Sequence, residues 1–207
     1  TEVQTQNADV AGPLDPGVIK GVGAAPGIAV GPVFHFRPVE LDVDRLAALP
    51  AAGRMDLSEA LQCAREQLTQ LQEQMADKKL GAEAAIFEAH RELLDDPELQ
   101  ESVQAHIEKG KTAIQAWQTA IDERVQAIAA LPDPLLAARA TDLRDVGERV
   151  LRLMLGIKES GVPTPDTPVI IIARELSPSD TASFDPDRVL GFGIVEGGPT
   201  SHIAILA

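Results

Sequence analysis

One histidine near the end of the sequence lies in a setting suited to phosphate chemistry. His202 follows Gly197, Gly198, Thr200 and Ser201 and precedes an apolar run that predicts the first turns of a helix. Glycines let the backbone approach a ligand closely, and a helix N-terminus with capping hydroxyls and unpaired N–H groups binds anions. A nucleophilic imidazole at such a turn indicates phosphorylation on histidine. For a lone Ser-His pair, an ordinary N-cap followed by a histidine is the alternative interpretation.

The charge balance limits the kinds of partner. The 207 residues include 32 acidic and 18 basic side chains, which gives a formal net charge of −14. This balance disfavours binding to nucleic acid or to an anionic membrane surface, and it suits a basic partner through electrostatic steering. Solubility alone would also explain it, and charge does not separate the two interpretations.

Cysteine usage and hydropathy bear on the compartment. Cys63 is the only cysteine, so no disulfide forms within the chain, and its place in a helical pattern predicts a buried small hydrophobic side chain. No apolar run approaches the roughly 18 residues of a membrane span, and no charged-then-apolar leader opens the sequence. We therefore expect a cytoplasmic protein without membrane insertion.

The elements that must position His202 can be read from the sequence pattern, which changes from strand-like to helical and back along the chain. Residues 1–16 are polar and contain two prolines, which predicts a flexible leader or linker. Residues 17–36 and 156–207 carry β-branched runs with glycine and proline between them, which predicts strands. The expected strands are two short ones joined by a turn between Val18 and Phe34, one in 167–173, and one in 189–195.

Between these β-rich stretches, residues 37–155 have a helical period. Apolar residues recur at spacings of three, four or seven from about Asp56 onward, which predicts a bundle of five helices. The third helix is expected to open at Asp96 with Pro97 in its first turn, and the fourth at the capping box of Thr112 and Gln115. Trp117 falls on an apolar stripe and is expected in the core.

Several strings, taken in order, resemble enzyme I of the phosphoenolpyruvate-dependent sugar phosphotransferase system. Besides the histidine turn they are residues 23–29, 85–96, 139–147 and 176–181. The resemblance covers about residues 18–207. It implies an α/β swivelling phosphohistidine domain, split in sequence and truncated here, with an inserted all-α helical bundle at 37–155. Pyruvate phosphate dikinase and phosphoenolpyruvate synthase share a similar histidine turn but lack this insertion.

The resemblance also implies a function. In the family, phosphoenolpyruvate bound in a carboxy-terminal barrel phosphorylates the histidine, which then passes the phosphoryl group to a histidine of the carrier protein HPr. Here His202 would carry the phosphoryl group, with Gly197, Gly198, Thr200 and Ser201 as the phosphate-binding turn. No cofactor or metal is expected in this fragment, and Mg²⁺ belongs to the absent barrel. Pro199 removes one amide from the turn.

Two further sets of residues are carried over by the resemblance. Thr181 matches a position whose hydroxyl contacts the active imidazole, and a threonine that only caps its helix is the alternative. The expected HPr-docking edge consists of Ile86, Glu88, His90, Leu93 and Asp95, with Leu136 and Arg139 across a groove. For His90, an ordinary solvated helix position is the alternative.

Three functional hypotheses follow from the sequence. The first is the HPr-docking and phosphohistidine part of an enzyme I, possibly from a multidomain multiphosphoryl transfer protein. The second is an inert fragment that binds HPr without transfer. The third is the phosphohistidine domain of a dikinase or synthase relative.

Overall fold

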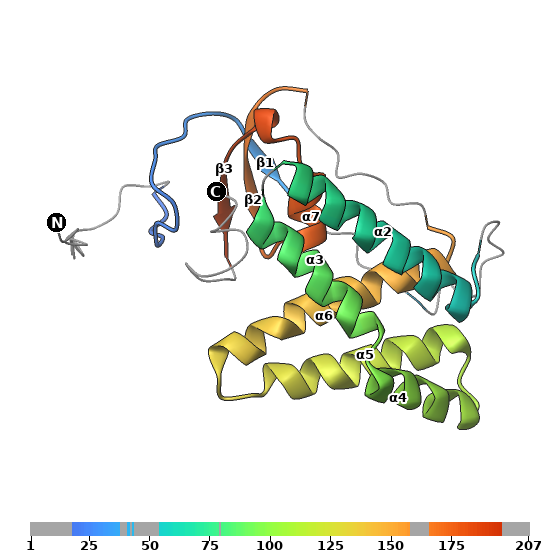
Figure 1. Cartoon of the computed structure of the whole chain (residues 1–207). Coiled ribbons are helices and arrows are strands. Elements are labelled where there is room, and N and C mark those ends of the chain that lie inside the picture. Colours follow the sequence, from blue (N-terminus) through green and yellow to red (C-terminus); the bar gives the residue numbers. More distant parts are fainter. Residues whose placement is uncertain are drawn as a thin grey trace.

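The computed structural model describes residues 18–37, 41, 43, 54–78, 80–157 and 166–195 of the chain. A short strand comes first, a run of helices follows, and two strands with a short helix between them come last (Figure 1). The elements are β1 (Val33–His35), α2 (Leu57–Asp77), α3 (Gly81–Leu94), α4 (Pro97–Glu108), α5 (Ala113–Ala129), α6 (Pro134–Met154), β2 (Val169–Ala173), α7 (Pro178–Ser183), a 3₁₀ turn (Pro186–Arg188) and β3 (Val189–Ile194).

The strands form one parallel sheet in the order β1-β2-β3. Phe34 lies opposite Ile171, and Ile171 lies opposite Phe192. The connection from β1 to β2 contains the whole helical bundle, whereas α7 and the 3₁₀ turn connect β2 to β3. Parallel neighbours need such crossover connections, because a tight hairpin reverses the chain direction. The fold therefore consists of a helical bundle inserted into a small α/β unit, as the sequence predicts.

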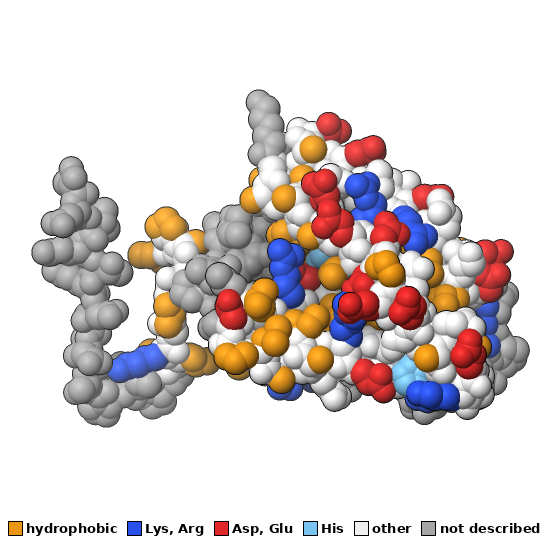
Figure 2. Space-filling model, turned by 60° about the horizontal axis from the view of Figure 1, so that its bottom comes forward, with side chains coloured by type: hydrophobic (Ala, Val, Ile, Leu, Met, Phe, Trp, Pro, Cys, Tyr) orange, Lys and Arg blue, Asp and Glu red, His pale blue; other side chains and the backbone are white. Residues whose placement is uncertain are grey.

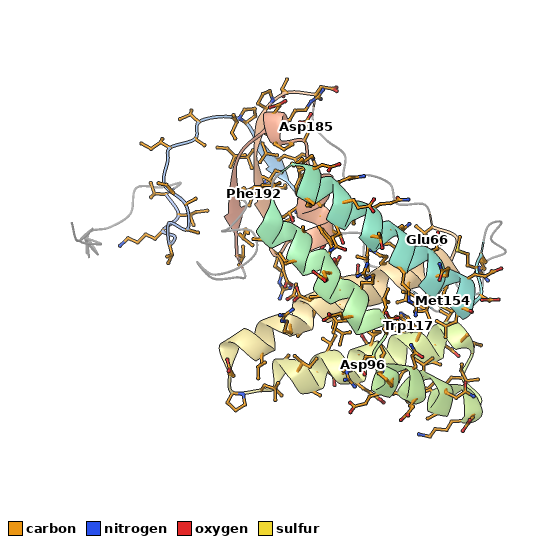
Figure 3. The ribbon with its side chains drawn as sticks, viewed as in Figure 1. Glu66, Asp96, Trp117, Met154, Asp185 and Phe192 are labelled. Atoms are coloured by element: carbon orange, nitrogen blue, oxygen red, sulfur yellow. The ribbon has the colours of Figure 1, made fainter. Side chains whose placement is uncertain are left out.

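The helices pack on a core of their own. The stripe predicted from the sequence is buried, with Trp117 at 1% exposure and Leu68 and Leu143 also buried. In Figure 3 Trp117 and Met154 lie among the helices, whereas Asp96 marks the start of α4. Burial of such side chains is worth about 1.5–3 kcal/mol each, which is why the apolar period sets the arrangement.

Caps define where the helices begin. Asp56 and Thr112 each make a capping box with the residue three positions later, at the starts of α2 and α5. Asp96 accepts a hydrogen bond from the Glu98 N–H at 2.9 Å, and Pro97 occupies the first turn of α4. The predicted starts of α4 and α5 are thereby confirmed, because each cap satisfies an N–H that the helix leaves unpaired.

The sheet has a second, smaller core. Its buried members are Phe36, Val169, Ile171, Ala173, Leu176 and Phe184, with Phe192 packed against them. Phe36 meets Phe184 edge to face at 5.7 Å between ring centroids. Ala182 of α7 packs against the bundle core instead. The segment around α7 therefore contacts both cores and joins the two parts of the fold.

Two expectations about local structure were wrong. Of the two strands expected between Val18 and Phe34, only β1 forms, and Val22, Ile28 and Val30 are all more than 80% exposed. No described strand pairs with residues 18–31, so the backbone there does not join the sheet. Cys63 is half-buried and not enclosed in the core.

Within the part of the chain that the structure describes, no helix is both long and apolar enough to cross a lipid bilayer.

Candidate phosphohistidine site and the helices that support it

The carboxyl ends of β2 and β3 lie at the same edge of the sheet. Ala173, the last residue of β2, is in register with Ile194, the last residue of β3, and Val195 donates its N–H to the Ala173 oxygen at 3.1 Å. The chain leaves this edge toward α7 after β2. After β3 it continues into the predicted phosphate turn. Ligands of open α/β sheets bind outside the carboxyl ends of the strands.

The predicted turn itself lies beyond the described residues. Gly197, Gly198, Thr200, Ser201 and His202 all fall in residues 196–207, which the structure does not describe. Their assignment as phosphate turn and phosphorylated histidine stays a prediction.

A reciprocal cap begins helix α7. Ser177 caps it by accepting from the Asp180 N–H at 3.1 Å, and Asp180 accepts from the Ser177 N–H at 3.0 Å. Pro178 takes the first turn, where its missing N–H costs nothing. This reciprocal cap fixes the start of a helix of only 6 residues, which is too short to be stable by propagation alone.

Thr181 is held in the middle of α7. Its side chain is 8% exposed, and its hydroxyl oxygen lies 2.8 Å from the Pro178 carbonyl oxygen and 3.2 Å from that of Ser177. The hydroxyl donates its single hydrogen to this pair of carbonyls, and its lone pairs stay available as acceptors. Thr181 thus bonds to its own helix and keeps the capacity to accept a hydrogen bond from an imidazole N–H.

A polar network fastens α7 to the bundle. Ser179 donates its hydroxyl to Asp145 of α6 at 2.5 Å, and Arg149 of α6 donates to Ser179 at 2.8 Å. The same guanidinium donates to Gln67 of α2 at 2.8 Å. Arg149 is 5% exposed, so these bonds lie in a water-poor environment where polar contacts are strong.

Two carboxyl groups beside this network have raised pKa values. Burial is the largest cause for both Asp180 and Glu148, and the negative charge of Asp145 adds to it. Hydrogen bonds from Ser177 oppose the shift at Asp180, and the Arg152 charge opposes it at Glu148. Burial at the junction of α6 and α7 therefore destabilises the charged forms of these two carboxyl groups.

The expected docking edge is only partly on the surface. Glu88 and Asp95 on α3 are exposed, and so are Leu136 and Arg139 on α6. Ile86 and Leu93 are half-buried, and Leu93 packs on the bundle core. Figure 2 shows acidic side chains spread over the described surface, with basic ones among them.

His90 is not on the surface at all. We expected it on the exposed edge of the docking helix, but its side chain is 0% exposed. The ring meets Phe87 edge to face, and its two nitrogens face Asp142 and Asp145 of α6, each at 3.5 Å. The expected exposure was wrong because α3 turns this position toward α6, and the carboxylates there provide polar partners for a buried ring.

Sequence reasoning missed the residues that join α6 to α7. Asp145, Arg149 and Ser179 received no role, although Asp145 and Ser179 fall in strings that carried the family resemblance. The available signal was Asp142 and Asp145, two acids three positions apart and therefore on one face of α6. Among the residues that the structure describes, no group of three or more His, Cys, Asp or Glu side chains is arranged to hold a metal ion.

Comparison with known proteins gives matches over most of the chain. The model of the N-terminal domain of phosphoenolpyruvate-utilising enzymes matches residues 20–139, and the model of their mobile domain matches residues 165–207. The solution NMR structure of enzyme I (nEIt) is 35% identical, has a TM-score of 0.61, and aligns over 92% of this chain and 78% of its own.

Two curated relatives are similar over nearly the same span. A multiphosphoryl transfer protein of Rhodobacter capsulatus is 40% identical over 187 residues, which are 90% of this chain and 23% of that protein. A phosphoenolpyruvate-protein phosphotransferase of Streptomyces coelicolor is 38% identical over 191 residues, which are 91% of this chain and 34% of that protein. The chain thus spans between about a quarter and a third of the length of these relatives.

Proposed function

Since the chain belongs to the phosphoenolpyruvate-utilising enzymes, we propose that it is the carrier-docking and phosphohistidine part of a phosphoenolpyruvate-protein phosphotransferase. His202 takes the phosphoryl group and exchanges it with a histidine of HPr or of an HPr-like carrier domain. Phosphoenolpyruvate is the original donor, bound with Mg²⁺ by a barrel domain of the parent protein. The relay takes place in the cytoplasm and supports sugar uptake.

The parallel pairing of β2 and β3 carries the proposal. Because of this pairing, the chain leaves the same edge of the sheet twice, after β2 toward α7 and after β3 toward the histidine turn. Ala173 and Ile194, the last residues of the two strands, are in register there. We expect the turn before His202 to lie at the same edge as Thr181, because it follows β3 in the chain as α7 follows β2. This is the arrangement that a phosphoryl-accepting imidazole needs, with an acceptor for one ring nitrogen and N–H donors for the phosphate oxygens.

The chemistry is an exchange between two imidazoles. The N–P bond on the carrier histidine breaks as an N–P bond to a ring nitrogen of His202 forms, and the carrier ring leaves with the electron pair. The other ring nitrogen of His202 keeps its hydrogen and donates it to Thr181, which fixes the tautomer. In-line positioning and stabilisation of the phosphoryl charge supply most of the catalysis in such transfers.

The surface chemistry suits a basic carrier. The net charge of −14 attracts a basic partner at long range, and the carboxylates of Glu88 on α3 and of Asp95 at its C-cap are exposed. Leu136 on α6 is 52% exposed and offers an apolar contact. Small apolar centres with charged rims are typical of protein–protein interfaces.

Calorimetry together with a transfer assay tests the proposal. The chain is titrated with a panel of HPr proteins, and transfer from each phosphorylated HPr is then measured. We expect saturable binding and transfer with the same HPr. Binding without transfer would instead identify an inert docking fragment. The absence of both would exclude the carrier exchange and favour a dikinase-type partner domain.

A further inference from the structure

His90 is a fully buried polar side chain, and docking does not explain it. Its Nε2 lies 3.5 Å from Asp142 Oδ1 and its Nδ1 lies 3.5 Å from Asp145 Oδ2. Both ring nitrogens are buried, and neither makes a hydrogen bond among the described residues. A buried polar group without a hydrogen bond is costly, so an imidazole at this place needs an explanation.

The two carboxylates determine which hydrogen bonds the His90 ring can make. A carboxylate only accepts hydrogen bonds, so each ring nitrogen must carry a hydrogen in order to bond to the group that it faces. The ring thus lies between two successive carboxylates of α6, and these contacts place α3 against α6. Arg139 lies 3.5 Å from the other oxygen of Asp142.

The connection continues from Asp145 into α7. The same oxygen that faces His90 Nδ1, Asp145 Oδ2, accepts the Ser179 hydroxyl at 2.5 Å. Ser179 in turn accepts from Arg149 at 2.8 Å, so its orientation is fixed from both sides. One oxygen atom is thus shared by a side chain of α3 and a side chain of α7.

Helix α7 is only 6 residues long, and Ser179 and Ala182 both join it to the bundle. Just before the helix, Glu175 accepts a hydrogen bond from Thr141 of α6 at 2.7 Å. Thr181 lies on the same short helix, with its hydroxyl bonded to the Pro178 oxygen. A shift of Asp145 therefore moves Ser179, and a rigid α7 carries Thr181 with it.

We propose that His90 is a positioning residue that acts through Asp145 and Ser179 to set the place of α7, and with it Thr181, relative to α3. It touches neither the carrier nor the phosphoryl group. Its effect on transfer rests on the function proposed above, whereas the coupling of α3 to α7 does not. Glu148 and Asp180, the partly buried carboxyl groups that interact with Asp145, are part of the same junction.

Kinetics with matched variants of the 207-residue chain test this role. His90→Gln replaces the ring by an uncharged side chain that still donates hydrogen bonds, and Ser179→Ala removes the hydroxyl that donates to Asp145. Ser183→Ala is the control, because its hydroxyl bonds to the Asp180 carbonyl on the exposed side of the same helix. Ser179→Thr keeps the hydroxyl and serves as the conservative rescue.

The expected result separates positioning from docking. Because small misplacements of reacting groups cost large factors in rate, we expect His90→Gln and Ser179→Ala to slow transfer at saturating phospho-HPr by about tenfold or more. The Kd for HPr should change by less than about twofold, and Ser179→Thr and Ser183→Ala should transfer like the parent chain. The double variant should be no slower than the slower single variant, since both act through one carboxylate. A raised Kd with an unchanged saturating rate, or additive effects, would overturn the proposal.

A second measurement does not depend on transfer. In ¹⁵N-labelled chain, His90→Gln should shift the amide signals of Ser179 and Thr181, whereas Glu92→Gln, an exposed change on the same helix, should not. Unmoved α7 signals in His90→Gln would refute the coupling even if transfer proceeds. Shifted signals in a chain that is never phosphorylated would keep the coupling and reject the proposed function.

Discussion

Trp117 donates its indole N–H to the main-chain oxygen of Gly147 at 3.0 Å, and this buried bond ties α5 to α6. The close approach is possible because residue 147 has no side chain: a Cβ there would lie 2.6 Å from Ile121 Cγ2. Since α6 also carries Asp142, Asp145 and Arg149, the depth at which α5 packs sets the position of the network that reaches α7.

Gly147→Ala should destabilise the chain. The added methyl group collides with the stiff β-branched Ile121, and overpacking of this kind costs about 1–3 kcal/mol, partly offset by the better helix propensity of alanine. Gly81→Ala is the control, because nothing lies within 4 Å of the new methyl group there. Urea unfolding should show a lower midpoint for Gly147→Ala alone. Equal midpoints for the two variants would contradict the packing described here.

Stability should fall as pH rises through the titration of the α6–α7 junction. Burial raises the pKa of Asp180 and of Glu148, so the folded chain holds these protons more tightly than the unfolded chain does. The free energy of unfolding is therefore highest below the ordinary carboxyl range and decreases up to the raised pKa values. Asp180→Asn keeps an acceptor for the Ser177 N–H and should raise stability at neutral pH, because it removes the buried charge.

Urea midpoints measured between about pH 4 and pH 8 check this sign. Asp180→Asn should show a shallower decrease with pH than the parent chain. A decrease of the same steepness in both chains would mean that Asp180 pays no burial penalty.

Thr181→Val should separate the effect of the Thr181 hydroxyl from the effect of its methyl group. Valine keeps the shape but loses the bond to the Pro178 oxygen, which costs about 0.5–1.5 kcal/mol of stability. If the hydroxyl also holds the tautomer of His202, transfer from phospho-HPr slows several-fold in Thr181→Val and stays normal in Thr181→Ser. Parent-like transfer by a folded Thr181→Val chain would leave Thr181 with a capping role only.

Glu88→Lys should weaken carrier binding without unfolding the chain. The side chain is exposed on α3, so stability should change by less than about 0.5 kcal/mol. Affinity for a basic HPr should fall several-fold at low salt, and the difference should shrink as salt screens the charges. Glu101→Lys, an exposed reversal on α4, is the control for net charge. Equal losses in both variants would point to overall charge and remove Glu88 from the docking edge.

The helices were predictable because their signals are local. The Asp96-Pro97 and Thr112–Gln115 caps and the apolar stripe around Trp117 each lie within a few residues of one another. The predicted family and fold class were confirmed by the matches over residues 20–139 and 165–207 and by the likeness to enzyme I. The two-part fold followed from the change between a helical period and β-branched runs.

The burial of His90 agrees with the helical period of α3, because Phe87, His90 and Leu94 are three and four positions apart on one buried face, and the docking edge implied by the resemblance led to the wrong expectation. No local pattern gives the two carboxylates beside the ring, because they come from α6, more than fifty positions along the chain. Ser179 reaches the same carboxylate from α7. The crossing of the helices brings these residues to one acceptor, and a local sequence pattern does not predict that crossing.

The central claim is that His202 carries the phosphoryl group, and site mapping tests it most directly. The chain is incubated with phospho-HPr, quenched in alkali, and mapped by mass spectrometry beside His202→Ala and His35→Ala. We predict an acid-labile, base-stable phosphate on His202 in the parent chain and in His35→Ala, and none in His202→Ala. Phosphate on another residue, or equal labelling of His202→Ala, would contradict the account.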